Sequence, residues 1–299
     1  MNILITGGLG FIGSRLAEHI SKYNNIYILD FVPPAKKSAT YKKLYKADIR
    51  NISEVKKVCK DIDAIIHLAA KSTPGDISNV DEFYDINVKG TMNLLEAART
   101  SGIKKFIFAS SSSVYGNAPK PQKEEMPCMP NSFYGASKLT CENLCMLYGN
   151  LYGMDVAIPR FFTIYGPKGR SDMAVSRFIE NIYSGKEIVI HGHGKIKKDF
   201  IHVSDVVESI NRMLSTKSAG IVNIGTGRSI ELNYLVKLIE SELKKKGKTS
   251  YIEKQKWDMD TEADIEKARK TLKWEPKITV ESGIKDTVKW WLSEAKPKL

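Results

Sequence analysis

Short apolar runs alternate with amphipathic stretches along the first 160 residues of the chain. Each apolar run is long enough for one buried strand, and these runs lie at residues 2–5, 26–29, 44–49, 64–70, 105–109 and 156–162. Helices are expected between them, at residues 14–20, 52–60, 88–100 and 132–152. Because strand and helix alternate about five or six times, the pattern predicts an α/β fold with a doubly wound parallel sheet. Such a sheet binds its ligands beyond the carboxyl ends of the strands.

The pattern changes near residue 160, where Pro159 interrupts the last of these apolar runs. Proline cannot donate a hydrogen bond to a neighbouring strand, so it suggests an edge strand or a bulge at this point. Further elements are expected beyond it, as helices at 174–183, 203–214 and 232–243 and strands at 188–190 and 221–225. We therefore expect a first domain over residues 1–160 and a smaller α/β domain over residues 161–299, with some later segments returning to the first sheet.

The first predicted strand leads directly into a glycine turn. Gly8, Gly10 and Gly13 fit the motif G-x-G-x-x-G, and Gly7 completes the alternative spacing G-x-x-G-x-x-G. Glycine in this motif makes a tight turn and lets the backbone approach a pyrophosphate, which the first N–H groups of the next helix face. Asp30 ends the second strand 17 residues after Gly13, where a carboxylate binds a ribose and repels a 2′-phosphate. A structural turn with a surface aspartate is the alternative, but the strand–turn–helix context favours an NAD site.

Composition and charge narrow the remaining classes of function. The chain has 299 residues and a formal net charge of +12. Nucleic-acid binding would explain this excess, but the lysines are dispersed and no nucleic-acid-binding motif is present, so we favour a solvated basic surface. No apolar run reaches the length of a membrane span, and the N-terminal residues form a strand and turn rather than a signal peptide. The four cysteines show neither a C-x-x-C pair nor a zinc spacing, so we expect a cytoplasmic protein without a metal site.

A tyrosine and a lysine four residues apart are the main catalytic candidates. Tyr134 and Lys138 lie in the predicted 132–152 helix, where this spacing places both side chains on one face. A nearby cation, like a positive nicotinamide ring, favours the phenolate, so the tyrosine is a candidate general base for a sugar or alcohol hydroxyl. The alternative is an ordinary exposed pair on a helix. Four serines, Ser110 to Ser113, follow a buried strand and precede this helix, which makes the catalytic interpretation more specific.

Together these motifs resemble the extended short-chain dehydrogenase/reductases, and within them the nucleotide-sugar epimerases and dehydratases. The resemblance runs in order from residue 1 to about residue 285. It implies a Rossmann domain that holds NAD and a second domain that binds the nucleotide-sugar. The residues that it places against NAD are Gly7, Gly10, Phe11, Ile12, Gly13, Asp30, Asp48, Ile49, Leu68, Ala69, Ala70, Asn87, Ser110, Tyr134, Lys138 and Phe162. It also implies that Tyr134 and Lys138 act in catalysis with Ser111, which would hydrogen-bond the reacting sugar oxygen.

A few positions separate the reactions of this family. Its dehydratases carry Asp-Glu where Ser112 and Ser113 stand here, and its UDP-glucuronate decarboxylases carry glutamate at the second position, so an epimerase remains. Most 4-epimerases of the family carry asparagine where Thr163 stands. Threonine there, followed by Gly-Arg-x-Asp-Met-Ala at 169–174, resembles the UDP-glucuronate 4-epimerases. Lys198 replaces the arginine of the family's Arg-Asp-Phe element, which puts that nucleotide contact in doubt.

Arg170 has a physical role in this interpretation, because a guanidinium can hold a carboxylate in a bidentate grip. Oxidation at C4 of a glucuronate makes a β-keto acid, and a fixed carboxylate orientation would prevent the loss of carbon dioxide. A diphosphate ligand or a surface charge is the alternative for this arginine. The substrate ligands that the resemblance implies are Ser111, Ser112, Ser113, Thr163, Arg170 and, for the diphosphate, Arg177.

The expected reaction is therefore inversion at C4 of a UDP-sugar, with UDP-glucuronate to UDP-galacturonate as the main hypothesis. Tyr134 would take the C4 hydroxyl proton while tightly bound NAD accepts a hydride, and both would return after the 4-keto sugar has turned over. The alternatives are a 4-epimerase of UDP-glucose/UDP-galactose or of N-acetyl sugars and, in another class, a non-catalytic sensor or binding protein. The resemblance also suggests a homodimer through the 88–100 and 132–152 helices, without a nucleic-acid or membrane partner.

Overall fold

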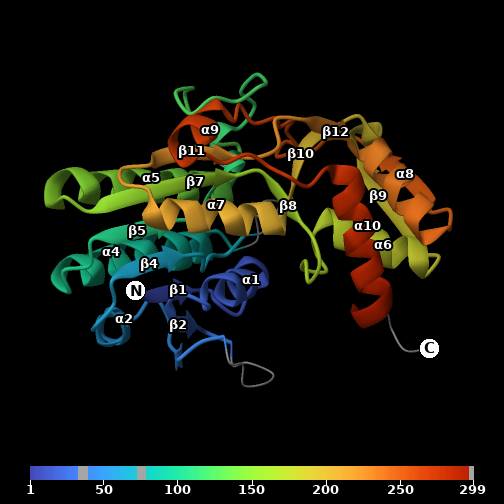
Figure 1. Cartoon of the computed structure of the whole chain (residues 1–299). Coiled ribbons are helices and arrows are strands. Elements are labelled where there is room, and N and C mark those ends of the chain that lie inside the picture. The colour runs from blue at the N-terminus through green and yellow to red at the C-terminus, as the bar shows by residue number, and fades with distance from the viewer. Residues whose placement is uncertain (33–39, 73–78, 296–299) are drawn as a thin grey trace.

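A parallel sheet forms the centre of the computed structural model, which describes residues 1–32, 40–72 and 79–295. It has eight strands in the order β11-β7-β5-β4-β1-β2-β3, with the short β6 paired to β7 (Figure 1). The strands are β1 (Asn2–Thr6), β2 (Asn25–Asp30), β3 (Lys43–Lys46), β4 (Ala64–His67), β5 (Lys105–Phe108), β6 (Ser110–Ser111), β7 (Asp155–Phe161) and β11 (Gly220–Ile224). The chain runs outward from β1 to β3 and then returns to β4, on the other side of β1. This reversal confirms the predicted doubly wound sheet and places its ligand crevice between β1 and β4.

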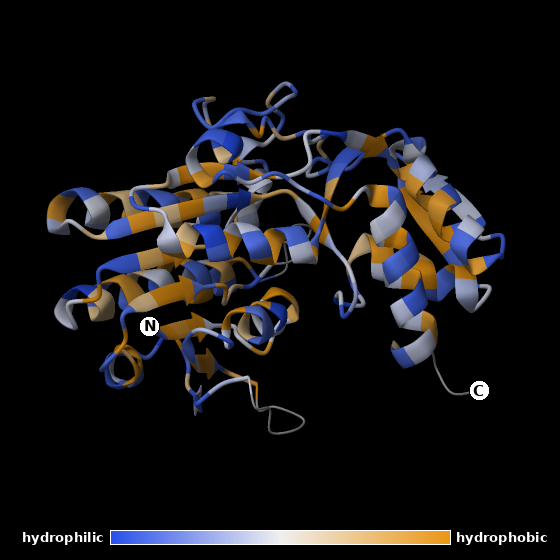
Figure 2. Ribbon diagram, viewed as in Figure 1, coloured by the Kyte–Doolittle hydropathy of each residue, from blue (hydrophilic) through white to orange (hydrophobic). Residues whose placement is uncertain are grey.

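Helices cover both faces of this sheet and bury its aliphatic side chains. One face packs against α1 (Phe11–Ile20), α7 (Val203–Ser215) and α9 (Glu266–Leu272), and the other against α2 (Ile52–Val58), α4 (Gly90–Thr100) and α5 (Phe133–Tyr152). Figure 2 shows the strands of the large sheet mainly in the hydrophobic colour, whereas the helices mix hydrophobic and hydrophilic residues. Burial of apolar surface, at about 25 cal/mol per Å², is therefore the main stabilising contribution of this layered arrangement.

A second group of elements lies to one side of the large sheet (Figure 1). Two small sheets belong to it, formed by β8 (Thr163–Tyr165), β10 (Lys197–His202) and β12 (Ser229–Glu231), and by β9 (Glu187–His191) and β13 (Lys248–Ile252). Its helices are α6 (Ala174–Tyr183), η3 (Gly192–Gly194), α8 (Leu232–Leu243), α10 (Val280–Trp290) and η4 (Trp291–Ala295). The elements α7, β11 and α9 follow residue 160 in the chain but pack with the large sheet. Within the described residues, no helix has the length and apolar character needed to cross a membrane.

Pro159 lies in an interior strand, so the expectation of an edge strand is wrong. β7 pairs with β11 on one side, where Pro159 lies opposite Val222. On its other side β7 pairs with β5 only up to Ala157 and with β6 only from Arg160. Pro159 falls in the gap between these two pairings, where no ladder pair needs its missing N–H. Like a bulge, this interruption of the pairing leaves a position in the strand that needs no N–H donor.

The helix expected to start at Val88 begins earlier, at Val80. It runs through α3 (Val80–Glu82) and the π-helical segment η1 (Phe83–Lys89) before it continues as α4. Asn87, which the sequence places just before the helix, therefore lies inside it. Single turns of π-helix are rare and are frequently found at functional sites, and Asn87 belongs to the candidate site described next.

Candidate active site

The glycine turn lies at the crevice between β1 and β4. Gly7 follows β1 with a φ of +67°, and a Cβ at this position would lie 2.8 Å from the amide nitrogen of Ala69, which follows β4. A Cβ at Gly13 would lie 2.6 Å from the Cα of Gly8. Gly10 precedes α1 and has no side chain with which to cap it, so the first N–H groups of the helix face outward for an anion. The close backbone packing and the uncapped helix start fit the diphosphate of NAD.

Two carboxylates border this turn at the ends of neighbouring strands. Asp30 Oδ2 accepts the N–H of Leu9 at 2.9 Å, which fixes the end of β2 beside the glycine turn. Asp48 accepts hydrogen bonds from Arg50 Nε and Nη2 at 2.9 and 2.6 Å, and this guanidinium lowers the pKa of Asp48. Ile49 is buried in the core that α2 and α4 share. The position of Asp30 suits a ribose hydroxyl. Contacts of Asp30, Asp48 and Ile49 with NAD stay predictions.

Tyr134 and Lys138 lie in the first two turns of α5. Lys138 is 3% exposed, its Nζ donates to the carbonyl of Ala109 at 2.9 Å, and it lies 5.8 Å from the centre of the Tyr134 ring. Burial lowers the pKa of Lys138 to about 8. Burial raises the pKa of Tyr134, against the opposing effects of a hydrogen bond with Ser111 and the charge of Arg170. The charge that lowers the pKa of Tyr134 here is that of Arg170, whereas the spacing in the sequence suggests Lys138 for this effect.

The four serines occupy the carboxyl end of the sheet, where β6 passes into η2 (Ser112–Tyr115). Ser111 Oγ accepts the N–H of Ser113 at 3.1 Å and lies 3.1 Å from its Oγ. Ser112 and Ser113 are 7% and 6% exposed. Ser110 donates a hydrogen bond to Glu142 on α5. The structure therefore brings Ser111 to Tyr134 but turns Ser110 toward the buried face of the helix.

Asn87 joins the segment that follows β4 to α5, the helix of Tyr134 and Lys138. Its Oδ1 accepts the N–H of Lys71 at 2.8 Å, and its Nδ2 donates to the carbonyl of Lys71 at 3.0 Å. The same Nδ2 donates to Ser137 Oγ at 2.9 Å, and Ser137 Oγ donates to the carbonyl of Tyr134 at 2.8 Å. Leu68, Ala69 and Ala70 precede Lys71, so one side chain fixes this segment against α5. Contact of Asn87 with NAD stays a prediction.

Arg170 lies between β8 and α6, and Thr163 begins β8. The guanidinium donates to Asp172 through Nε at 2.9 Å and Nη2 at 2.6 Å, and it also donates to the Oγ and the carbonyl of Ser72. Arg170 and, less strongly, Arg177 lower the pKa of Asp172. Arg170 is exposed and already holds one carboxylate in a bidentate grip. This arrangement is chemically able to hold a second carboxylate, from a ligand, beside Tyr134.

Comparison with known proteins identifies the family, because residues 3–225 match the NAD dependent epimerase/dehydratase family. The chain belongs to this family. A UDP-glucuronate 4-epimerase of Thermodesulfobacterium geofontis is 37% identical over 307 residues, which covers 96% of this chain and 95% of that protein. A putative UDP-glucose 4-epimerase of Methanocaldococcus jannaschii is 36% identical over 300 residues, with 96% and 97% covered. The solved UDP-glucuronic acid 4-epimerase of Bacillus cereus, in complex with UDP-glucuronic acid and NAD, has a TM-score of 0.91 at 29% identity, with 97% and 98% covered.

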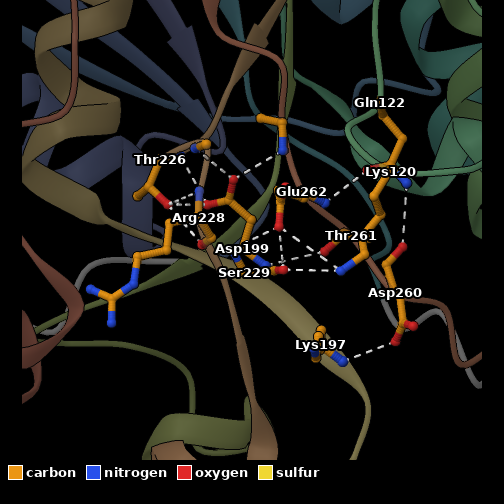
Figure 3. A network of polar contacts seen from close by, with 12 residues as sticks. Lys120, Gln122, Lys197, Asp199, Thr226, Arg228, Ser229, Asp260, Thr261 and Glu262 are labelled. Atoms are coloured by element: carbon orange, nitrogen blue, oxygen red, sulfur yellow. Dashed lines mark hydrogen bonds and ion pairs between the residues drawn. The ribbon is translucent and has the colours of Figure 1, made fainter.

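The epimerase/dehydratase family's Arg-Asp-Phe element is Lys198-Asp199-Phe200 in this chain, and its aspartate is the centre of a buried polar network (Figure 3). Asp199 is fully buried and accepts hydrogen bonds from Thr226 N at 2.8 Å, Thr226 Oγ1 at 2.6 Å, Gly227 N at 3.0 Å and Ala263 N at 3.0 Å. Four donors satisfy the carboxylate, so it ties β10 to the segments after β11 and before α9. Asp199 is therefore structural here, and it gives the small sheets a fixed position.

A cavity of about 500 Å³ adjoins this network and shares Lys120 and Asp260 with it. Two segments line it, and their charged side chains are Lys120, Lys254, Lys256, Asp258 and Asp260. Asn131, three residues before Tyr134, donates to the carbonyl of Lys256 at 3.0 Å, so a wall of the cavity is attached to the start of α5. The lysines suit a diphosphate.

Three residues of the candidate site were not predicted from the sequence, and they differ in whether any local pattern could have indicated them. Glu142 lies four residues after Lys138, so helical spacing alone could have placed it on the same face. Asp172 lies two residues after Arg170, and a neighbouring carboxylate is an evident partner for a guanidinium. Ser72 contacts Arg170 across 98 residues of chain, and no local pattern indicates that contact.

Proposed function

We propose that this protein is an NAD-dependent 4-epimerase of UDP-sugars and that its substrate is UDP-glucuronate, which it converts to UDP-galacturonate. The observation that carries the substrate is Arg170, whose guanidinium grips a carboxylate and whose charge acts on the catalytic Tyr134. Ser111 is a hydrogen-bond partner of the same tyrosine, and Ser112 and Ser113 follow it in the chain without an acidic side chain among the three. A hydroxyl-rich site with one arginine suits an acidic sugar, and it lacks the acid that a dehydratase or a decarboxylase of this family carries.

Proton transfer is the task of the protein's own residues. The chemistry that NAD supplies when bound is acceptance of a hydride from C4 and its return to the opposite face of the sugar. Tyr134 would take the proton from the C4 hydroxyl and later return it, with Ser111 as its hydrogen-bond partner. Burial raises the pKa of Tyr134 in the ligand-free site, so Arg170 and the positive nicotinamide ring of bound NAD would have to favour the phenolate. The residues that would hold NAD are those of the glycine turn, Asp30 and the segment before Lys71.

Arg170 would also protect the reaction from loss of carbon dioxide. The 4-keto form of a glucuronate is a β-keto acid, which decarboxylates when its C–C bond turns out of the plane of the carbonyl. A bidentate guanidinium fixes that orientation. In the ligand-free site Arg170 donates to both carboxylate oxygens of Asp172 through Nε and Nη2, which supports the proposal that its guanidinium can grip a planar carboxylate. Thr163 would supply a further hydroxyl from the start of β8.

A substrate panel tests this proposal. Purified protein, with no NAD added, is incubated with UDP-glucuronate, UDP-glucose or UDP-N-acetylglucosamine, and products are identified by NMR. We expect UDP-galacturonate from UDP-glucuronate, and slower or no inversion of the uncharged sugars. Inversion of UDP-glucose but not UDP-glucuronate would replace the substrate proposed here. In Tyr134→Phe we expect turnover to be lost while NAD and UDP-sugar still bind, and unchanged turnover would contradict the role of the tyrosine.

We further propose that the protein is a homodimer joined through η1, α4 and α5. Large apolar side chains are exposed along these helices, at Tyr84, Met92, Met146, Leu147 and Leu151. Exposed apolar side chains that gather on one surface support the proposal that another protein covers it. Light scattering on a sizing column should give twice the mass of the 33.5 kDa chain. The cysteines are free thiols, which supports the proposal that the protein works in the reducing cytoplasm.

A further inference from the structure

Three buried polar side chains between the glycine turn and the catalytic helix have no task in the chemistry proposed above. Thr6 ends β1, His67 ends β4 and Thr91 lies in the first turn of α4, and their exposed fractions are 0%, 1% and 0%. Thr6 Oγ1 lies 2.6 Å from His67 Nδ1, and His67 Nε2 lies 3.0 Å from Thr91 Oγ1. Two strands and a helix that are distant in sequence are thus joined by one imidazole.

These hydrogen-bonded side chains form a row that runs from the N–H of Ala69 to the carbonyl of Asn87. The groups at its two ends decide which atom donates in each hydrogen bond between them. Thr91 Oγ1 lies 2.5 Å from the carbonyl of Asn87, which can only accept, so the threonine hydroxyl donates there. The hydroxyl must then accept from His67, whose Nε2 therefore carries the proton. Nδ1 is left as an acceptor and takes the hydroxyl proton of Thr6, and Thr6 Oγ1 accepts the N–H of Ala69 at 3.3 Å. The order is Ala69 to Thr6 to His67 to Thr91 to Asn87, each donating to the next.

Both ends of the row lead to the candidate active site. Ala69 packs over Gly7, so its N–H belongs to the segment against which NAD is predicted to lie. Asn87 holds the backbone of Lys71 and, through Ser137, the carbonyl of Tyr134. The row and the Asn87 side chain therefore connect the cofactor side of the crevice to the backbone of the proposed general base. Thr6, His67, Thr91, Asn87 and Ser137 lie in strands or helices, and through them the row holds the irregular segment that contains Ala69 and Lys71.

We propose that Thr6, His67 and Thr91 are positioning residues. Their hydrogen bonds, which all donate in one direction along the row, hold the 69–71 segment and the Tyr134 helix in a fixed position relative to each other. Burial, and secondarily the charge of Lys138, lower the pKa of His67 to about 3, so the imidazole stays neutral and the order persists at physiological pH. A displacement of about 1 Å between reacting groups can reduce turnover about 100-fold. Loss of the order should therefore lower kcat while it leaves the binding of the UDP-sugar almost unchanged.

Thr91→Val and Thr91→Ser form the matched pair that tests this proposal. Valine has the shape of threonine but cannot accept from Nε2, whereas serine keeps the hydroxyl. We expect kcat of Thr91→Val to fall roughly 10-fold with KM within about twofold, a smaller effect than full misplacement, and Thr91→Ser to restore most of it. Equal kcat in the two variants, or a loss confined to KM, would overturn the proposal.

Nitrogen-15 NMR of histidine-labelled protein tests the proton order without substrate, so its outcome is independent of the proposed reaction. The chain has five histidines, and His67→Gln assigns the signal of interest. We expect the Nε2–H tautomer in the unmodified protein, unchanged between about pH 5.5 and pH 9, and conversion to the Nδ1–H tautomer in Thr91→Val. An Nδ1–H tautomer in the unmodified protein, or titration within this range, would overturn the proposal even if the valine variant did not fold.

Discussion

Glu142→Gln should destabilise the protein strongly, because Glu142 and Arg160 form an ion pair inside it. Their side chains are 1% and 3% exposed. Arg160 Nε donates to Glu142 Oε1 at 2.9 Å and Nη2 donates to Oε2 at 2.7 Å, while Ser110 donates to Oε1 as well. Glutamine replaces one accepting oxygen with an NH₂ group that must face a donor of the guanidinium. The variant thus leaves a buried positive charge without its counter-ion.

The size of the effect follows from the burial of the pair. Removing one partner of a buried ion pair costs about 3–5 kcal/mol. Unfolding entropy is about 2.1 cal/mol/K per residue, which gives about 0.63 kcal/mol/K for 299 residues that unfold together. We therefore expect the melting temperature to fall by about 5–8 °C. Glu266→Gln is the matched control, since Glu266 and Arg269 form an exposed pair worth about 0–1 kcal/mol, or less than about 2 °C.

Differential scanning calorimetry of the two variants and the unmodified protein is the assay. The double variant Glu142→Leu/Arg160→Met removes both charges, and we expect it to recover much of the stability lost in Glu142→Gln, because an apolar pair of similar volume avoids the unpaired charge. If Glu142→Gln melts within 2 °C of the unmodified protein, as the surface control should, the argument from burial is wrong. A double variant less stable than the single one would contradict the role given to the unpaired guanidinium.

Three further predictions concern the cofactor, a titration and the dimer. Gly13→Ala should purify folded but without NAD, because its Cβ would lie 2.6 Å from the Cα of Gly8, and absorbance of the denatured protein's supernatant measures the bound nucleotide; full NAD occupancy would contradict this. The pKa of Lys138 is about 8 in the native protein and about 10.5 in the unfolded chain, so the unfolded chain binds more protons between pH 8 and pH 10.5. The free energy of unfolding should therefore rise with pH in this range, and denaturant titrations of Lys138→Met should lack the rise. Leu151→Asp should halve the mass in light scattering, since this side chain is 62% exposed on α5, whereas Tyr23→Asp, distant from that surface, should not.

Local patterns predicted the elements that carry the chemistry. The glycine turn, the end of β2 at Asp30 and the helix of Tyr134 and Lys138 all have signals within about 20 residues of sequence, and the structure has those elements. The strand order was also predictable in kind, because alternation of strand and helix permits few topologies. Pro159 shows where such rules stop. A proline argues against an interior strand, but the gap between β5 and β6 that accommodates it depends on the register of three strands.

The contacts that sequence could not predict are those between side chains far apart in the chain. His67 joins Thr6 and Thr91 across 61 and 24 residues, and Arg170 reaches Ser72 across 98. No periodicity marks these residues, because Thr6, His67 and Thr91 lie in apolar, buried patterns, and Arg170 and Ser72 lie outside the strands and helices. The effect of Arg170 on the pKa of Tyr134 belongs to the same group. It arises only when the loop before α6 meets the carboxyl end of the large sheet.

The groups around Tyr134 differ in how firmly they are held, and the proposed reaction needs this difference. One tyrosine and one cofactor would exchange a proton and a hydride with the sugar before and after it turns. These two groups must therefore keep their positions while the sugar turns. Lys138 donates to the backbone of Ala109, and Asn87 bonds the backbone of Lys71 and, through Ser137, the carbonyl of Tyr134, which holds the tyrosine on the first domain. Arg170, by contrast, is exposed on a loop and bonded to another exposed side chain. Because Arg170 lies on a loop, its grip can follow a substrate carboxylate and keep it held while the sugar turns, and the reacting groups stay in place.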